Sequence, residues 1–327
     1  MTDKGIRFMR RLLLALGALV ALAHPALAWP DRPVTLIPNF GPGTSQDVLA
    51  RLIAPRLQAA WGQPVIVNNV VGAAGTIGVD RVAKAAPDGY TLVLTGDAAM
   101  VVRVSMSPRP PYDPGRDLAP VVLLGYTPNL LVVSNGNPAR SVADLVAAAR
   151  ARPGTLTFGH AGTGTSQHIG GEMLAQMAGV ELTGVAYNEP AAQVLDVQNG
   201  RVTMSFQSGV VALPRLRDGT WRALAVSSAG RMSAVPDLPT VAEAANLPGF
   251  EAQAWLAIFA PAGTPAPVVA QINRDVIAAM AVPEVRGRMA DLGIEYAGST
   301  PEELGALVRR EIPRMAGVLQ RAGIRPE

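Results

Sequence analysis

The chain has 327 residues, of which 49% are hydrophobic, with 28 Lys and Arg against 25 Asp and Glu and no cysteine. The basic excess comes from an N-terminal leader, and the remaining sequence carries equal numbers of acidic and basic residues without a Lys/Arg cluster, which gives no footprint for nucleic acid or an anionic membrane surface. The length and apolar content suffice for two substantial cores, which must supply the stability because disulfides are excluded.

Residues 1–28 have the organisation of a secretory signal peptide. A basic segment precedes the apolar run LLLALGALVALA, and Ala26-Leu27-Ala28 is a small-x-small cleavage signal. The apolar run is shorter than the roughly 20 residues that a membrane-spanning helix needs. We therefore expect cleavage after Ala28 and export to the periplasm. The lack of Cys excludes a lipid anchor at the cleavage point.

A first group of predicted elements follows the leader. It consists of the strand VTLIPNF, the helix VLARLIAPRLQAAW, the strand PVIVNN, the helix GTIGVDRVAKAA and the strand YTLVLTG. Pro55 lacks the N–H that would bond the Arg51 carbonyl, so we expect a kink or a break in the first helix. This order of elements is typical of a βαβαβ unit.

A second group repeats this order. Its predicted strands are LTFGHA, VELTGVAY and RVTMSFQ, and its predicted helices are SQHIGGEMLAQMAG and PAAQVLDVQNG. The sequence Gly-Thr-Ser-Gln occupies the first strand-to-helix turn of both groups, as residues 43–46 and 164–167. The groups share little other sequence, so a coincidence of common loop residues is the alternative to structural parallelism.

Two stretches are expected to cross between domains. The segment YDPGRDLAPVVLLGYTPNLLVV reads as a turn and an apolar stretch broken at Gly125 and Pro128, and a Pro-rich passage joins WRALAVSS to AWLAIFAPAGTP. Near the C-terminus, Thr300 precedes Pro301 and can form a capping box with Glu303, which predicts the start of a helix.

The repeated turns are predicted to bind an anion. A turn between a parallel strand and a helix presents unpaired backbone N–H groups and the positive end of the helix dipole. Both turns also carry hydroxyl groups that can donate to a carboxylate, namely Thr44, Ser45, Thr163, Thr165 and Ser166. Facing each other across a cleft, with aromatic packing from Phe40, the turns would hold a small carboxylate-bearing molecule. We also expect these hydroxyl groups to cap the two helices, which is compatible with binding.

Neither turn matches a nucleotide-binding loop or a hydrolase motif. No Gly-Lys-Ser/Thr follows, and Gln46 and Gln167 stand where GxGxxG would place its third Gly. A serine hydrolase would need GxSxG and a partnered His. His160 and His168 lack a third metal ligand, and His168 is expected instead to donate to a ligand carboxylate. We therefore predict no enzymatic activity, no catalytic residue, no metal and no cofactor.

Other candidates for the site lie at strand ends. Asp97 and Glu189 could meet a cationic group on a ligand, and the alternative for each is a solvated loop. Tyr187 ends a strand on the cleft side, and its alternative is burial in the core. Asp47 is interpreted as complementing the start of its helix.

In chain order the sequence contains FGPGTSQDVLARLIAPRL, GQPVIVNN, GAAGTIG, AKAAPDGYTLVL, YDPGRDLAPV, AGTGTSQHIGGEML, RALAVSSAGR, PDLPTVAEA and APAGTP. Together these segments resemble the periplasmic tricarboxylate-transporter substrate-binding proteins, the Bug family. The resemblance implies an α/β, two-domain periplasmic-binding-protein-like fold (type II, Venus flytrap), with a mostly parallel sheet in each domain and a ligand cleft between them. It implies a solute-binding protein that passes a small carboxylate to a two-component membrane permease, with a sensor receptor as the alternative partner.

The resemblance also implies which residues form the site. It places ligand contacts in residues 40–47 and 163–168, with Tyr187 beginning a third wall. The predicted ligand-binding residues are Phe40, Gly43, Thr44, Ser45, Gln46, Asp97, Thr163, Gly164, Thr165, Ser166, His168, Tyr187, Glu189 and Gln207. After the signal peptide 1–28, the expected domains are 29–127 with 241–327, and 128–240. A monomer is expected.

Four positions depart from the family pattern. Thr44 replaces the second Gly of the first loop, and Val70-Val71-Gly72 replaces Arg-Pro-Gly. The third wall reads Tyr187-Asn188-Glu189 where the family has Tyr-Lys-Gly, and Gln207 stands where a carboxylate is common. A plain dicarboxylate is the default ligand. Because Glu189 replaces a Gly, an amino acid or another zwitterionic carboxylate is the alternative.

Overall fold

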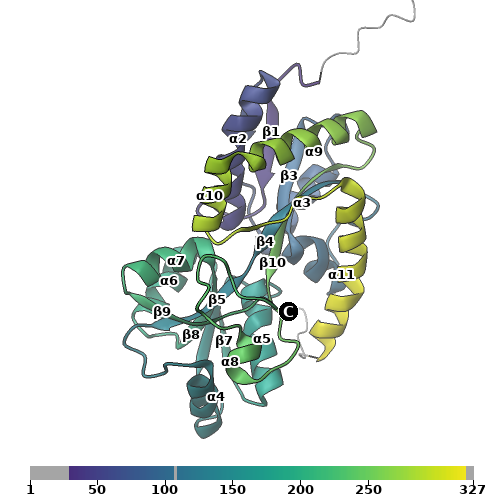
Figure 1. Cartoon of the computed structure of the whole chain (residues 1–327). Helices are drawn as coiled ribbons and strands as arrows, with labels where there is room; N and C mark the ends of the chain where they lie inside the picture. The colour runs from purple at the N-terminus through teal and green to yellow at the C-terminus, as the bar shows by residue number, and fades with distance from the viewer. Residues whose placement is uncertain (1–28, 107–108, 322–327) are drawn as a thin grey trace, which may run out of the picture.

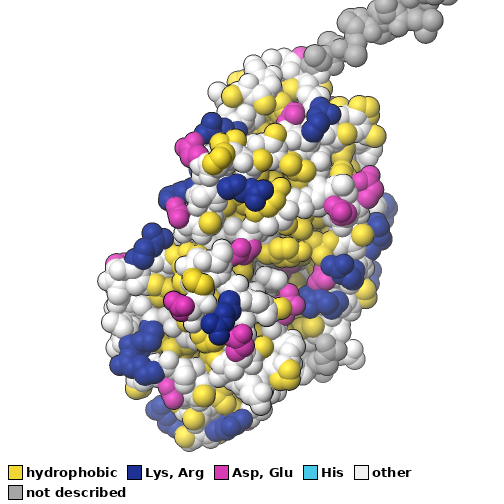
Figure 2. All heavy atoms as spheres, viewed as in Figure 1, with side chains coloured by type: hydrophobic (Ala, Val, Ile, Leu, Met, Phe, Trp, Pro, Cys, Tyr) yellow, Lys and Arg dark blue, Asp and Glu magenta, His cyan; other side chains and the backbone are white. Residues whose placement is uncertain are grey.

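The computed structural model describes residues 29–106 and 109–321, so the predicted signal peptide lies outside the described residues. The described chain forms two α/β lobes, each built on one sheet (Figure 1). Charged side chains of both signs are interspersed over the face seen in Figure 2, and neither sign gathers in one patch there. No helix within residues 29–106 and 109–321 is long and apolar enough to cross a membrane.

The first lobe contains a six-stranded sheet with the order β11-β4-β10-β3-β1-β2. Its strands are β1 (Val34–Pro38), β2 (Val65–Val67), β3 (Thr91–Gly96), β4 (Leu118–Thr127), β10 (Ala254–Pro261) and β11 (Glu295–Tyr296). Its helices are α2 (Ser45–Trp61), α3 (Thr76–Ala83), α9 (Ala266–Ala281), α10 (Pro283–Asp291) and α11 (Pro301–Arg321), with the short helices η1 (Ala73–Gly75), η2 (Ala98–Val102) and η3 (Arg103–Ser105).

The second lobe contains a five-stranded sheet with the order β7-β6-β8-β5-β9. Its strands are β5 (Asn129–Ser134), β6 (Thr157–His160), β7 (Thr183–Ala186), β8 (Met204–Ser208) and β9 (Trp221–Val226). Its helices are α4 (Val142–Ala151), α5 (Ser166–Ala178), α6 (Pro190–Gln198), α7 (Gly209–Arg217) and α8 (Val241–Ala245).

Both predicted βαβαβ units form, but the sheets are mixed and not mostly parallel. Strands β2, β1 and β3 pair in parallel in the first lobe, as do β7, β6 and β8 in the second. Strands β4 and β10 are antiparallel to each other, and so are β5 and β9. The reason is that β4 leaves the first lobe and β10 returns to it, while β5 enters the second lobe and β9 leaves it, so the members of each pair run in opposite directions.

The apolar stretch between the units forms two strands. Only Pro128 separates β4 from β5, and it is the point where the chain passes from one sheet to the other. The predicted break at Gly125 was wrong, because Gly125 lies inside β4 and pairs with Tyr296 of β11. A Cβ atom at Gly125 would lie 2.4 Å from the Glu295 carbonyl oxygen, so glycine permits this pairing and does not end the strand.

The predicted start of α11 is confirmed, whereas the predicted break in α2 is not. Thr300 and Glu303 form the predicted capping box, in which Glu303 N–H donates to Thr300 Oγ1 over 3.2 Å and Thr300 N–H donates to Glu303 Oε2 over 2.8 Å. Helix α2, in contrast, runs without a break through Pro55. Pro55 is exposed, so water can satisfy the Arg51 carbonyl that loses its helical partner.

The two lobes share buried contacts. One cluster of buried side chains joins Met100 and Val102 of η2 to Leu131, Phe158 and Phe206 of the second lobe. On another side of the lobe interface, where α10 lies beside α7 in Figure 1, Gly209 at the start of α7 packs against the backbone that follows α10. Nearby, Ser233 donates from both its N–H and its Oγ to Glu295 Oε1, over 2.9 and 2.7 Å.

Gly209→Ala should lower the free energy of unfolding by about 1–3 kcal/mol. A methyl group there would lie 2.7 Å from the Leu292 carbonyl oxygen and 2.8 Å from the Gly293 Cα atom. Because these atoms belong to the other lobe, the variant should also have a larger radius of gyration. Chemical denaturation and small-angle X-ray scattering measure the two effects. Gly230→Ala is the matched control, because a Cβ there meets no atom within 4 Å. Unchanged stability and scattering for Gly209→Ala would contradict the close contact.

Candidate functional site

A cleft of about 340 Å³ lies between the lobes, and the two repeated turns line it from opposite sides. The first lobe contributes Phe40, Pro42, Gly43, Thr44, Ser45, Gln46, Asp97, Ala98, Thr127 and Ala254. The second lobe contributes Asn129, Ala161, Thr165, Ser166, Gln167, Pro190, Ala191, Gln193, Val194, Gln207, Ser208, Val210, Val211 and Arg215. Nine of the residues predicted from sequence therefore line one cavity: Phe40, Gly43, Thr44, Ser45, Gln46, Asp97, Thr165, Ser166 and Gln207.

The two repeated turns have the same backbone geometry. Gly43 and Gly164 take the left-handed conformation, with φ of 81° and 82°, which a glycine adopts without strain. Thr44 Oγ1 donates to the Gly41 carbonyl over 2.7 Å, and Thr165 Oγ1 donates to the Gly162 carbonyl over 2.8 Å. The shared sequence therefore encodes a shared turn.

In each turn the glycine N–H donates to the side chain four residues later. Gly43 N–H donates to Asp47 Oδ2 over 3.0 Å, and Gly164 N–H donates to His168 Nδ1 over 3.2 Å. Asp47 and His168 thus occupy equivalent positions, and each holds its loop against the start of its helix by accepting this hydrogen bond. A polar acceptor at this position lets the helix start support the loop that precedes it.

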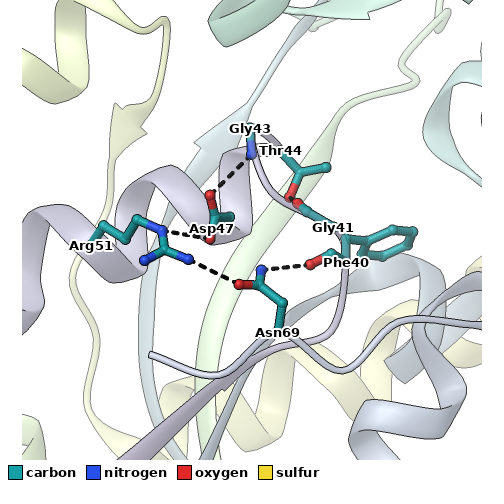
Figure 3. Close-up of polar contacts among 7 residues, drawn as sticks. All are labelled: Phe40, Gly41, Gly43, Thr44, Asp47, Arg51 and Asn69. Atoms are coloured by element: carbon teal, nitrogen blue, oxygen red, sulfur yellow. Dashed lines mark hydrogen bonds and ion pairs between the residues drawn. The ribbon is translucent and has the colours of Figure 1, made fainter. Parts of the chain in front are cut away.

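The first turn is braced further by a chain of polar contacts (Figure 3). Arg51 Nε donates to Asp47 Oδ1 over 2.8 Å, and an Arg51 terminal nitrogen donates to Asn69 Oδ1 over 3.1 Å. Asn69 Nδ2 in turn donates to the Phe40 carbonyl over 2.9 Å. These contacts connect α2 to the loop at Phe40 and at Gly43, so both residues are held relative to the helix start.

The helix starts differ in capping. Thr165 Oγ1 accepts from His168 N–H over 3.4 Å, which confirms the predicted cap of α5. Thr44 makes no side-chain cap to α2, so that expectation was wrong for the first turn, where the hydroxyl group only donates to the Gly41 carbonyl. The N–H groups of Ser45 and Gln46 lie in the first turn, where no intrahelical acceptor exists. Both residues line the cleft, which leaves the start of α2 suited to an anion.

A network of amides supports the second turn. Gln167 Oε1 accepts from Ala161 N–H over 2.9 Å and from Gln193 Nε2 over 3.0 Å. Gln193 and Gln207 both donate to Ser205 Oγ, over 3.1 and 3.0 Å. The network is neutral and buried, so it fixes the cleft wall without adding charge.

Charged residues contribute little to the lining. Asp97 is the one acidic residue and Arg215 the one basic residue among the described residues that line the cleft. Burial raises the pKa of Asp97 to about 7, although N–H groups of the backbone at Trp255 and Ala98 act in the opposite direction. The Arg215 guanidinium lies 5.2 Å from the centroid of the Trp221 ring and donates to the Val211 carbonyl. In residues 29–106 and 109–321, no group of three or more acidic or His side chains is arranged to hold a metal ion.

Five predicted residues do not line the cleft: Thr163, Gly164, His168, Tyr187 and Glu189. A Cβ atom at Gly164 would lie 2.9 Å from a Val102 methyl group, so the second turn packs closely against η2 of the other lobe. The Tyr187 hydroxyl donates to Asp196 Oδ2 over 2.8 Å, and Glu189 is exposed at the start of α6. His168 Nδ1 accepts from the loop, and burial together with the nearby His160 lowers the pKa of His168 to about 4.

Sequence reasoning missed several polar residues of the cleft, among them Asn129, Gln193 and Arg215. Asn129 is the first residue of β5, and its Nδ2 donates to Ser166 Oγ over 2.9 Å. A single amide directly after Pro128 in an otherwise apolar stretch was a signal that could have found it. Gln193 and Arg215 lie within helices and carry no comparable signal, because only the packing of α6 and α7 brings them to the cleft.

Comparison with known proteins finds one family across most of the chain. The model of the tripartite tricarboxylate transporter family receptor matches residues 49–324. A UPF0065 protein from the tcbD-tcbE intergenic region of Pseudomonas sp. is 40% identical over 308 residues, covering 94% of this chain and 91% of that protein. BugT of Bordetella pertussis is 36% identical, covering 96% of this chain and 98% of BugT.

Solved structures of high similarity share the two-lobed architecture. An R. palustris protein with adipate has a TM-score of 0.87 and 36% identity, covering 91% of this chain and 100% of that chain. The periplasmic binding protein BugD has a TM-score of 0.84 and 31% identity, with 91% and 100% covered. MatC from Rhodopseudomonas palustris with bound malate has a TM-score of 0.81 and 34% identity, with 89% and 100% covered. The fold is therefore that of two-domain periplasmic binding proteins.

Thr165→Val should lower the free energy of unfolding by about 0.5–2 kcal/mol more than Thr44→Val. Both variants lose a hydroxyl group that donates to a carbonyl, but only the Thr165 hydroxyl also accepts from the first turn of its helix. Urea denaturation followed by circular dichroism measures both values. Equal losses would contradict the difference in capping between the two turns.

The His168 pKa predicts a loss of stability in acid. Because this pKa is about 4 in the folded protein and ordinarily about 6.5, the unfolded chain binds a proton between these values that the folded protein does not. This contribution to stability is present above pH 6.5 and is lost as the pH falls towards 4. The raised Asp97 pKa has the opposite effect between pH 4 and 7, so wild type and variant must be compared directly.

The variant for this comparison is His168→Asn, which keeps an acceptor for Gly164 N–H and cannot titrate. We expect the wild type to lose more stability than His168→Asn when the pH is lowered from 7 to 4.5, as measured by thermal and urea unfolding. Parallel pH profiles would show that His168 keeps an ordinary pKa.

Proposed function

The chain belongs to the tripartite tricarboxylate transporter receptor family, and we propose that it is a periplasmic solute-binding protein that captures a small carboxylate between its lobes. The observation that carries this proposal is the convergence of two helix starts, one from each lobe, on one cleft. Related proteins with adipate and with malate, at 36% and 34% identity, support a carboxylate ligand.

The proposed mode of binding uses backbone N–H groups and hydroxyl groups. Ser45 and Gln46 on one side, with Ser166 and Gln167 on the other, would donate to the carboxylate, and Phe40 would pack on its carbon skeleton. Each helix dipole contributes roughly 0.3–1 kcal/mol, rising to about 2 kcal/mol where the group is partly buried. Because the donors belong to different lobes, a bound carboxylate would favour the closed arrangement of the lobes.

We further propose that residues 1–28 direct export and that the loaded protein delivers its solute to a two-component permease. The family description and the periplasmic location of BugD support this role. The relatives that guide the assignment are solute-binding proteins, and we therefore propose that the chain binds its ligand without turning it over.

Ser45→Pro tests the role of the backbone donor. Proline suits the first position of a helix and Thr44 already has the extended conformation that precedes proline, so α2 should remain intact while one N–H is lost. Ser45→Ala is the matched control, which loses only the hydroxyl group. A hydrogen bond to a charged group contributes about 1.5–3 kcal/mol, so Ser45→Pro should bind at least about tenfold more weakly than Ser45→Ala.

The measurement is calorimetric titration of the mature protein with adipate, malate and the carboxylates that raise its melting temperature in a thermal-shift screen. Equal affinities of Ser45→Pro and Ser45→Ala would contradict binding at the start of α2. Stabilisation by uncharged compounds alone, or conversion of a bound compound, would overturn the proposed function.

A further inference from the structure

Asp97 is a buried carboxyl group that faces the cleft without a cationic partner. It follows β3 directly and lines both the cleft and a second cavity of about 250 Å³ beneath α11. Its residue is only 6% exposed. No ion pair found among the described residues includes Asp97, in contrast to Asp47, which is equally buried and pairs with Arg51.

The charges around Asp97 do not supply the missing partner. In the second cavity, Arg310 and Arg314 both pair with Glu311, at 3.5 and 2.6 Å, and Glu251 adds another carboxylate. Glu311 acts on Asp97 as a like charge and raises its pKa. Across the cleft, Arg215 of α7 lies over the Trp221 ring of β9. The surroundings of Asp97 therefore favour its neutral form unless a cation enters the cleft.

The position of Asp97 brings it close to the proposed carboxylate donors. A Cβ atom at Gly96, its neighbour in the chain, would lie 3.9 Å from Gln46 Nε2 of the first turn. Ser166 of the second turn lines the same two cavities as Asp97. A ligand with its carboxylate at the helix starts would place the adjoining carbon atoms next to Asp97. A second carboxylate there would meet a like charge, whereas an ammonium group would supply the missing partner.

We propose that Asp97 determines specificity for a carboxylate that also carries a protonated amine close to that carboxylate, as in an α-amino acid, with the ammonium group bound by Asp97. This inference rests on the proposed function of the cleft and names its ligand class. Of the two carboxyl groups that the sequence suggested for a cationic group, Asp97 and Glu189, the inference selects Asp97. Glu189 is exposed and does not line the cleft, whereas Asp97 is buried in the cleft wall.

Calorimetric titration with matched pairs of ligands tests the inference. The pairs are L-aspartate with succinate, L-glutamate with glutarate and L-2-aminoadipate with adipate, which differ only in the α-amine. The mature wild type should bind the amine-bearing member of the preferred pair at least about tenfold more tightly, the size of one charge-assisted contact. Asp97→Asn keeps the shape of the side chain and should lose this preference, whereas the exposed control Asp237→Asn should keep it.

A proton count gives a second readout that a merely structural role would not change. Because the pKa of Asp97 is raised to about 7, part of the free protein carries a proton on Asp97 at neutral pH, and an ammonium group would displace it. Titration in two buffers of different ionisation enthalpy should therefore show net proton release on binding by the wild type, and none by Asp97→Asn.

The outcomes separate this inference from the proposed function. Tighter binding of the diacids by the wild type, or an unchanged preference in Asp97→Asn that still unfolds cooperatively, would overturn the role of Asp97 and leave a carboxylate-binding cleft in place. Failure of all six compounds to bind would overturn the α-amine proposal, and the proposed function would fall with it only if the wider carboxylate screen also found no ligand.

Discussion

The first-turn N–H groups of α2 and α5 are the constraint on which the rest of the structure depends. A helix cannot satisfy these donors internally, and here they belong to residues that line one water-accessible cleft. Each lobe reaches this arrangement with the same means: a parallel strand, a left-handed glycine, a threonine that bonds the preceding loop and a helix. Asp47 in one lobe and His168 in the other accept from the glycine N–H and hold the loop, while the serine and glutamine that begin each helix line the cleft.

The lobes must also be placed relative to each other for the two turns to share a ligand. The mixed sheets serve this purpose, because the strands that carry the chain out of one lobe and back lie side by side, and β4 continues after Pro128 into β5 of the other sheet. The second turn rests on Val102 of η2, and Gly209 packs on the segment after α10. These contacts use glycine because a Cβ atom at Gly164 would press on the Val102 side chain and one at Gly209 would press on the backbone after α10. Small residues at the interface therefore set how closely the lobes approach.

The polar groups that line the cleft are mostly uncharged, and this makes its few charged groups informative. The amides of Gln167, Gln193 and Gln207 satisfy one another through Ser205, so they shape the cavity without attracting ions. Against this background Asp97 is an exception, since it is a buried carboxyl group with no ion pair among the described residues, and the arginines of the adjoining cavity pair with Glu311. Backbone N–H groups act on the Asp97 carboxyl group, but a buried carboxylate without a cationic partner is costly in free energy, and such groups are found at functional sites. The cost of burying the Asp97 carboxyl group and the proposed specificity thus concern the same side chain.

The sequence by itself determined the two βαβαβ units, the position of both repeated turns, the capping box of α11 and the family, because these depend on local periodicity and on motifs within a few residues. It also identified nine of the residues that line the cleft, since loop residues at strand ends meet at one edge of a sheet. Only the tertiary structure decided that Pro55 stays within a helix, that Gly125 lies in a strand, and that Thr44 leaves α2 uncapped. The tertiary structure also decided that Gln193 and Arg215 line the cleft and that Glu189 does not. The physical reason is that exposure, strand partner and side-chain direction depend on segments far apart in the chain, and local sequence carries no record of which segments those are.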